Sequence, residues 1–219
     1  MYRHDAQALR PHYLVEIDPK PFLEGNCEPP PVPEWVGEHL RANPFAVVRR
    51  GPVTGEHVPI GVRGAERNQR WAARCQPKLV RRVITPPQLL ARLVSRSRAD
   101  AAPALRALQR LESRWMDLDH PWGPGGSVGF ELATGRQVVK GNSDLDIVIY
   151  ATRRMLSDEA RALSADAMEL PATVDNRVET PVCGFSLREY ACASAAAILL
   201  RTQSGAVLGR DPWRANPGS

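Results

Sequence analysis

An acidic pair at the start of an apolar segment constrains this chain more than any other feature of its sequence. Residues 145–150 read Leu-Asp-Ile-Val-Ile-Tyr, which predicts a buried β-strand, and Asp144 comes directly before them. Because alternate residues of a strand point the same way, Asp144 and Asp146 are expected to share one face, with Cα atoms roughly 6–7 Å apart. Two such carboxylates repel each other, and a shared hard cation such as Mg²⁺ relieves that repulsion. The structural alternative is a pair of exposed aspartates at the irregular start of a strand.

A third carboxylate is a candidate to complete a two-metal site. Residues 172–178 alternate apolar and polar side chains, which predicts a second strand, and Asp175 lies within it. In two-metal sites one ion activates the attacking oxygen while the other supports the leaving group. We therefore expect Asp175 to be a metal ligand, with Glu179 as the alternative third carboxylate. Taken in isolation, Asp175 also fits a surface position on a strand.

A glycine pair precedes these acidic residues. Gly125 and Gly126 are followed by Ser127 at a break between two elements. Adjacent glycines let the backbone approach a ligand closely, and the amides of a turn can point together at a phosphate, aided by a serine hydroxyl. By itself this triplet is more typical of an ordinary turn that begins a helix.

Composition excludes several classes of protein. The chain has 219 residues, of which 43% are hydrophobic and 24% charged, as in ordinary globular proteins. No apolar run approaches the roughly 20 residues that cross a bilayer, and the first residues lack the apolar region of a secretory signal. The four cysteines show no C-x-x-C spacing, which favours reduced thiols in a cytoplasmic protein.

The formal charge of +5 is concentrated in the first part of the chain. Residues 1–85 hold 13 basic and 9 acidic side chains. Within them, residues 63–82 hold seven basic side chains and one acidic one, Glu66. Such a patch favours an anionic partner, namely nucleic acid, a phosphorylated small molecule or an acidic protein, although a solvated basic face is the simpler interpretation.

The pattern of elements predicts an α+β protein with two domains. Short strands are expected at 12–17, 44–50, 58–63 and 79–85, with a proline-rich connector at 28–33. From Pro86 the pattern becomes helical, and the order of later elements predicts a mixed sheet with helices. The expected later elements are a helix beginning at Pro86, a helix containing residues 105–118, strands at 145–150, 172–178 and 182–185, and helices at 157–170 (with Ser157 as N-cap) and 187–200. We expect a small β-rich or α+β N-terminal domain over 1–85 that binds substrate or partner through its basic residues, a catalytic domain over 86–213 and a tail over 214–219.

Taken together, the Gly-Ser turn, the Asp-x-Asp strand and the later Asp resemble the DNA polymerase β-like nucleotidyltransferase superfamily. The closer likeness is to the phosphoribosyl-dephospho-CoA transferases, the holo-acyl-carrier-protein synthases of malonate decarboxylase. It rests on residues 122–135 (Trp-Gly-Pro-Gly-Gly-Ser-Val-Gly-Phe-Glu-Leu-Ala-Thr-Gly) followed by 143–146 (Ser-Asp-Leu-Asp). It extends to residues 3–5, 60–64, 67–71 and 211–213, and so spans nearly the whole chain. The sequence departs from the superfamily pattern in two places. The 17 positions from Ser127 to Asp144 are more than the usual gap, and the segment around Asp175 matches less sharply.

The resemblance implies a nucleotidyltransferase-like fold and a specific reaction. A phosphoribosyl-dephospho-CoA group would pass from triphosphoribosyl-dephospho-CoA to a serine of the acyl-carrier subunit of malonate decarboxylase, and pyrophosphate would leave. It implies that Asp144, Asp146 and Asp175 hold Mg²⁺, while Gly126 and Ser127 cradle the β- and γ-phosphates. Arg63, Arg67 and Arg70 would then contact the remaining phosphates or the acidic carrier protein, since guanidinium groups suit bidentate phosphate contacts. No role is expected for the five histidines.

Two other functions stay open from the sequence. The same chemistry could transfer a nucleotide to another acceptor, such as a protein hydroxyl, a small molecule or a nucleic-acid end. Alternatively, a catalytically inactive fold could bind RNA through the basic patch at 63–82. The intact Asp-x-Asp argues against a binding module, because such a module gains nothing from two carboxylates that repel each other. We therefore expect no nucleic-acid partner, and no membrane partner because no apolar run is long enough to cross a bilayer.

Overall fold

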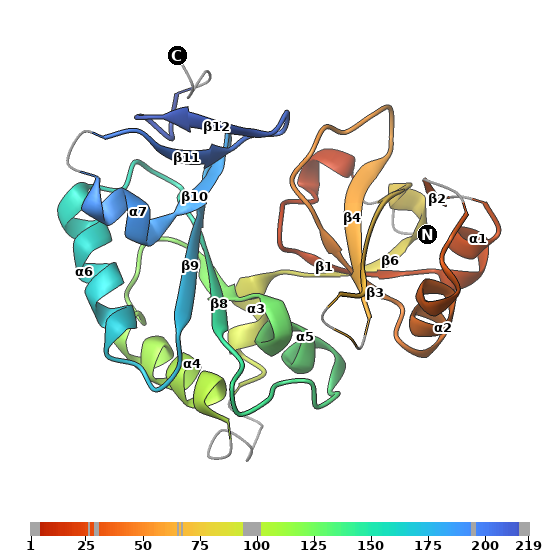
Figure 1. Cartoon of the computed structure of the whole chain (residues 1–219), viewed down its shortest axis with the longest axis horizontal. Helices are drawn as coiled ribbons and strands as arrows, with labels where there is room; N and C mark the ends of the chain where they lie inside the picture. Colours follow the sequence, from red (N-terminus) through yellow and green to blue (C-terminus); the bar gives the residue numbers. More distant parts are fainter. Residues whose placement is uncertain are drawn as a thin grey trace. The chain divides into compact units, whose positions relative to one another are not determined.

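The structure is a computed structural model that describes residues 5–25, 27–28, 31–64, 66, 68–93, 102–193 and 196–214. Arg67, Pro29, Pro30, Val94 and Ser194 therefore lie outside the described residues, as does nearly all of the expected tail. The chain divides into two compact units, Met1–Thr85 and Pro86–Ser219 (Figure 1). Each has its own six-stranded sheet, so the expected α+β class is confirmed.

The N-terminal unit is an antiparallel sheet with two short helices. Its strand order is β2-β5-β4-β3-β1-β6. Phe22 and Val36, from α1 and α2, are fully buried among the apolar side chains of the sheet. The elements are 3-10 helices η1 (Ala6–Ala8) and η2 (Pro77–Leu79), helices α1 (Pro19–Leu23) and α2 (Glu34–Ala42), and strands β1 (Leu14–Ile17), β2 (Cys27–Glu28), β3 (Phe45–Val48), β4 (Val58–Arg63), β5 (Arg70–Cys75) and β6 (Val80–Ile84).

Four of these six strands were expected, but β2, β5 and the two helices α1 and α2 were not. β5 reads Arg-Trp-Ala-Ala-Arg-Cys, which is poor in β-branched residues and resembles a basic surface segment. Full pairing with β4 makes it a strand: Ala73 and Cys75 are buried in the core, while Arg70 and Ala72 are exposed. Pairing with β4 thus makes this segment a strand although its local sequence propensity does not favour one.

The C-terminal unit is a mixed sheet in the order β12-β11-β10-β9-β8-β7. Strands β8 and β9 are parallel and are joined through α6, whereas all other neighbouring strands are antiparallel. The elements are helices α3 (Pro86–Leu90), α4 (Pro103–Arg114), α5 (Gly126–Thr134), α6 (Ser157–Met168) and α7 (Leu187–Cys192), and strands β7 (Trp122–Pro124), β8 (Leu145–Tyr150), β9 (Val174–Glu179), β10 (Gly184–Ser186), β11 (Ile198–Arg201) and β12 (Ala206–Gly209).

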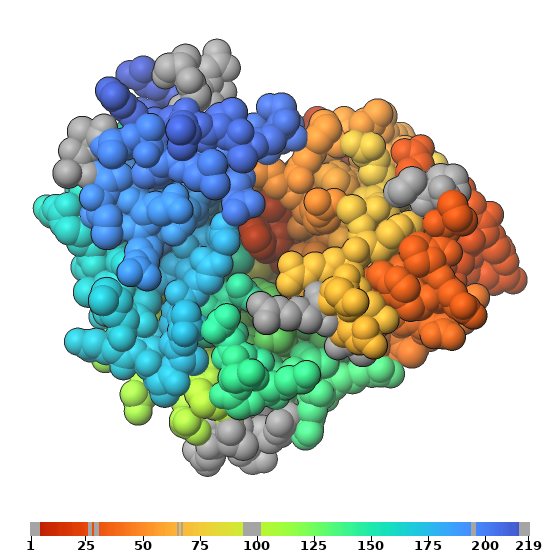
Figure 2. Space-filling view, viewed as in Figure 1, coloured from red at the N-terminus to blue at the C-terminus, as the bar shows by residue number. Residues whose placement is uncertain are grey.

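Helices cover the two faces of this sheet differently. Figure 1 shows α4 and α6 on one side of β8 and β9, and α3 with α5 on the other. Leu145, Ile147 and Ile149 alternate along β8 and are fully buried. In the space-filling view, α6 and the C-terminal strands pack as one continuous body, coloured from cyan to blue (Figure 2). Asp146 lies on the opposite face of β8, toward the start of α5.

Three expectations for this unit are wrong. The helix expected to contain residues 105–118 ends at Arg114, so Leu118 lies outside it. The helix expected at 187–200 ends at Cys192, and Ile198 begins strand β11, which pairs with β12. Ile198 and Leu200 are buried while Leu199 is exposed, so burial in this segment follows the two-residue period of a strand and not the period of a helix. In α6 the N-cap is Leu156 rather than Ser157, and the Glu159 carboxylate accepts a hydrogen bond from the Leu156 amide at 3.4 Å. No helix in the described part of the chain is long and apolar enough to cross a membrane.

Candidate active site

The parallel pairing of β8 with β9 sets two of the expected acidic residues side by side. Asp146 and Asp175 are direct partners in the register. Neighbouring strands lie about 4.8 Å apart, and residues in register point to the same face, so both carboxylates project from one face of the sheet. The amide of Leu145 donates to the Thr173 carbonyl at 2.9 Å, which fixes this register at the start of both strands. The crossover through α6 therefore brings together two acids that are 29 positions apart in the sequence.

The glycine turn lies against Asp146. The Gly125 amide donates to the Asp146 carbonyl at 2.8 Å, which ties the turn to β8. Gly126 has φ +52, a conformation that L side chains rarely adopt, and a Cβ built there would overlap the Oδ2 atom of Asp146. The bare glycine backbone thus allows the carboxylate to pack against the first residue of α5. Ser127, the second residue of α5, is half-buried beside it.

Asp144 lies directly before β8, which spans the residues expected for this strand. β8 begins at Leu145, so the alternation of the strand does not by itself fix the direction of the Asp144 side chain. A turn precedes it, in which the Ser143 amide donates to the Lys140 carbonyl at 3.1 Å and the Lys140 amide donates to Ser143 Oγ at 2.9 Å. Asp144 is exposed, whereas Asp146 is half-buried.

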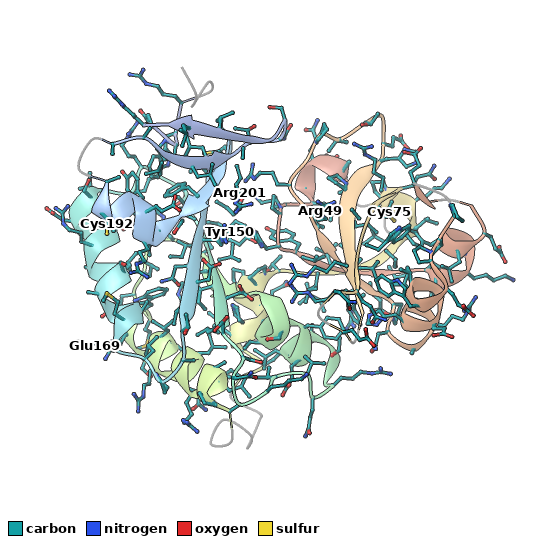
Figure 3. The ribbon with its side chains drawn as sticks, in the orientation of Figure 1. Arg49, Cys75, Tyr150, Glu169, Cys192 and Arg201 are labelled. Atoms are coloured by element: carbon teal, nitrogen blue, oxygen red, sulfur yellow. The ribbon has the colours of Figure 1, made fainter. Side chains whose placement is uncertain are left out.

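The register distinguishes the two candidates for the third carboxylate. Glu179 is the register partner of Tyr150, at the far end of β8, and not of Asp146 (Figure 3 labels Tyr150). It is also buried, with 5% exposure, and its carboxylate lies against Gly184, where a Cβ would overlap it. Asp175 is therefore the carboxylate that the sheet places beside Asp146.

Asp175 is held by a neighbour on its own strand. Arg177 Nη2 donates to Asp175 Oδ2 at 2.8 Å, and both residues project from the same face of β9. Among the residues that the structure describes, no three His, Cys, Asp or Glu side chains are grouped as a metal site. Mg²⁺ commonly takes only one or two protein carboxylates and completes its six ligands with water and substrate phosphates. The carboxylate of Asp146, beside the glycine turn at 125–127, and the exposed carboxylate of Asp144 are oxygen donors of the kind that such an ion takes.

Two further residues of these elements, Arg177 and Glu131, were not predicted from the sequence. Arg177 belongs to an alternating Asp-Asn-Arg strand pattern, in which a charge two positions after Asp175 must share its face. Glu131 lies in the Gly-Phe-Glu-Leu-Ala-Thr-Gly segment and is completely buried, which is rare for a carboxylate. Its Oε2 accepts hydrogen bonds from the amides of Val138 and Val139 at 2.8 and 2.9 Å. Glu131 thus shapes the loop that leads from α5 to Asp144.

Replacing Glu131 with alanine should destabilise the protein by about 2–4 kcal/mol, because two amides that it now binds lose their acceptor. Chemical denaturation of the variant and the wild type measures this difference. Glu169→Ala, at an exposed ion pair with Arg114, should cost less than about 1 kcal/mol and serves as the control. Equal stability of the two variants would show that the buried carboxylate does not hold this loop.

In the N-terminal unit, Arg63 and Arg70 face each other across β4 and β5 and are exposed. Like charges directly opposite in an antiparallel pair are destabilising, so these side chains favour a bound anion. The third member of the expected set, Arg67, lies outside the described residues.

Comparison with known proteins assigns the chain to a family. Residues 10–86 match the family model described as the phosphoribosyl-dephospho-CoA transferase MdcG N-terminal domain, and residues 89–212 match the corresponding C-terminal domain. The chain belongs to the phosphoribosyl-dephospho-CoA transferase family. A relative with that name from Azotobacter vinelandii is 38% identical over 186 residues, covering 83% of this chain and 86% of the relative. Another, from Pseudomonas syringae, is 36% identical over 212 residues, or 95% of each chain.

The family assignment covers both units and makes the protein a transferase enzyme. A phosphoribosyl-dephospho-CoA transferase from Klebsiella pneumoniae is 36% identical over 93% of this chain and 96% of its own. No solved structure matches the chain.

Proposed function

We propose that the protein transfers the phosphoribosyl-dephospho-CoA group from triphosphoribosyl-dephospho-CoA to a serine of the acyl-carrier subunit of malonate decarboxylase. The observation that carries this proposal is the packing of the glycine turn at 125–127 against Asp146, with Asp175 beside it in register. A phosphate-binding turn next to paired carboxylates suits the transfer of a group from a polyphosphate. The family membership supports the identity of the transferred group.

In this proposal the serine Oγ of the carrier attacks the α-phosphorus of the triphosphate. A new phosphodiester bond forms, the bond from the α-phosphorus to the bridging oxygen breaks, and pyrophosphate leaves with that oxygen. The hydroxyl proton passes to a carboxylate of the site or to water. Such transfers depend mainly on positioning and on neutralising the charge of the phosphates, so no protein nucleophile is required.

Asp144 and Asp146 are proposed to hold Mg²⁺, with Asp175 completing the site once the substrate is bound. When bound, the ion neutralises phosphate charge and lowers the pKa of a coordinated hydroxyl. The role of the protein is to fix the carboxylates. Asp146 is fixed by its place in β8 and by the contact with Gly126, and Asp175 by its register with Asp146.

Gly126 and Ser127 are proposed to bind the β- and γ-phosphates. Gly126 begins α5, and the first amides of a helix have no partner within the helix, so they point outward as donors. A glycine with no Cβ lets a phosphate oxygen come close to these amides. The Ser127 hydroxyl adds a further donor at the same turn.

Arg63, Arg67 and Arg70 are proposed to bind the remaining phosphates or the acidic carrier. Arg63→Ala and Arg70→Ala should each raise KM about tenfold for one of the two substrates, because each loses one charge-assisted contact. Steady-state kinetics with each substrate varied in turn identify which one is affected. Arg41→Ala, an exposed arginine of α2, is the control and should leave both values unchanged. Unchanged KM values for Arg63→Ala and Arg70→Ala would remove this role.

The acceptor is tested by intact-mass spectrometry. The full chain is incubated with Mg²⁺, triphosphoribosyl-dephospho-CoA and the unmodified carrier subunit. We expect the carrier to gain the mass of one phosphoribosyl-dephospho-CoA group, and its serine→alanine variant to gain none. A parallel incubation with ATP should leave the carrier unchanged. Adenylylation with ATP, or modification of the serine→alanine carrier, would instead show a different acceptor or donor.

A further inference from the structure

Arg177 makes the one cationic contact of the Asp175 carboxylate within the described residues. The guanidinium Nη2 of Arg177 lies 2.8 Å from Asp175 Oδ2, so the two side chains form an ion pair with each other. The pair lies beside Asp146 on the face of the sheet that carries the proposed site. Arg177 is also the only cationic residue of β8 and β9, which otherwise contribute acidic and neutral side chains.

We propose that Arg177 is the counter-ion of Asp175 while the site is empty and a ligand of the triphosphate when the site is filled. This inference rests on the function proposed above. A divalent ion held at about 2.1 Å by the Asp175 carboxylate would lie close to the guanidinium that now binds Oδ2, and the two positive charges would repel each other. Binding of the ion to Asp175 therefore releases the guanidinium, and the triphosphate is the anion available to it.

The surroundings of Arg177 allow this change of partner. Its register neighbours are Val148 on β8 and Ser186 on β10, so no second carboxylate flanks it in its row. Its side chain is 30% exposed and that of Asp175 is 41% exposed, so both are accessible to a ligand. A guanidinium also presents paired donors that match two phosphate oxygens. One side chain could thus balance the carboxylate before binding and the phosphates afterwards.

This exchange predicts effects of opposite sign on two ligands. Removing the positive charge leaves Asp175 without its counter-ion, so metal alone should bind more tightly, by about fivefold for one charge at this range. Inorganic triphosphate in the presence of metal should bind more weakly, by about tenfold or more, because its guanidinium contact is lost. A residue that served only to stabilise the strand would not change the two affinities in opposite directions.

The experiment measures Mn²⁺ binding by electron paramagnetic resonance and then binding of inorganic triphosphate with Mn²⁺ saturating, using the full chain. Arg177→Met should tighten the first and weaken the second. Arg177→Lys keeps the charge and should restore the Mn²⁺ affinity of the wild type while only partly restoring triphosphate binding. Arg114→Met, which also breaks an arginine–carboxylate pair, is the matched control and should change neither affinity.

Each other result has a distinct meaning. Unchanged or weaker Mn²⁺ binding by Arg177→Met, or unchanged triphosphate binding, would overturn the exchange while leaving the metal site in place. If Asp146→Asn bound Mn²⁺ as well as the wild type, the proposed metal site itself would fail, and this inference with it. Thermal melting of every variant confirms that the folds compared are the same.

Discussion

Asp146→Asn should reduce the transfer rate by about a thousandfold or more while leaving the fold intact. The asparagine keeps the shape of the side chain but removes the charge that the site offers to a divalent ion and thus to the developing charge of the phosphates. Asp146 is half-buried and packs against Gly126, so its position is set by the fold rather than by the ligand. The measurement is the single-turnover rate with saturating substrate, together with a circular dichroism spectrum.

A matched substitution separates this loss from a general effect of charge. Asp117→Asn changes an exposed aspartate outside the helices and strands of the C-terminal unit and should retain the full rate. Asp175→Asn should also lose most of the transfer rate. Glu179→Gln should not affect the proposed metal site, because Glu179 lies at the far end of β9 from Asp175. A normal rate in Asp146→Asn would show that β8 is not the catalytic strand.

Gly126→Ala should reduce the transfer rate by about a hundredfold or more through geometry alone. Its φ of +52 costs an alanine about 1–2 kcal/mol, and the new Cβ would overlap Asp146 Oδ2. Because the carboxylate must then move, the ligand position shifts, and a displacement near 1 Å is enough for a loss of this size. The same single-turnover assay measures the rate, and Mn²⁺ binding should weaken with it.

Two nearby glycines provide the controls. A Cβ built at Gly141 has no atom within 4 Å, and the φ of this residue is not in the left-handed region. Gly141→Ala should therefore have the transfer rate of the wild type. At Gly125 the Cβ would make ordinary contacts, 3.5 Å from Val148 Cγ2 and 3.7 Å from Asp146 Cβ, so its effect should be smaller than that at Gly126. If all three variants were equally active, the close approach of the turn to Asp146 would have no catalytic role.

The strand that carries Asp146 was predictable because it depends on short-range periodicity. The alternation in residues 145–150 predicts the strand, and the same period predicts that Asp146 leaves the apolar face. The alternation does not determine the register in which β8 pairs with β9. The pairing of Asp146 with Asp175 rather than Glu179 depends on how α6 returns the chain, and that return is a property of packing.

Elements that depend on partners were not predictable in the same way. β5 has few β-forming residues and is a strand because β4 pairs with all six of its positions. The segment at 198–201 looks helical in its spacing but pairs with β12. Glu131 carried no recognisable role in the sequence, since only the folded loop shows that its carboxylate accepts two backbone amides.

The dependence of pyrophosphate release on Mg²⁺ tests the central claim most directly. Wild type and Asp146→Asn are mixed with triphosphoribosyl-dephospho-CoA and the carrier subunit, and pyrophosphate is measured as Mg²⁺ is titrated from a chelated solution. The wild type should release one pyrophosphate per modified carrier, with a rate that rises to saturation with Mg²⁺, and the variant should release almost none at any concentration. Release that is unaffected by chelation, or equal in the two proteins, would contradict the claim that these carboxylates bind the ions that neutralise the polyphosphate.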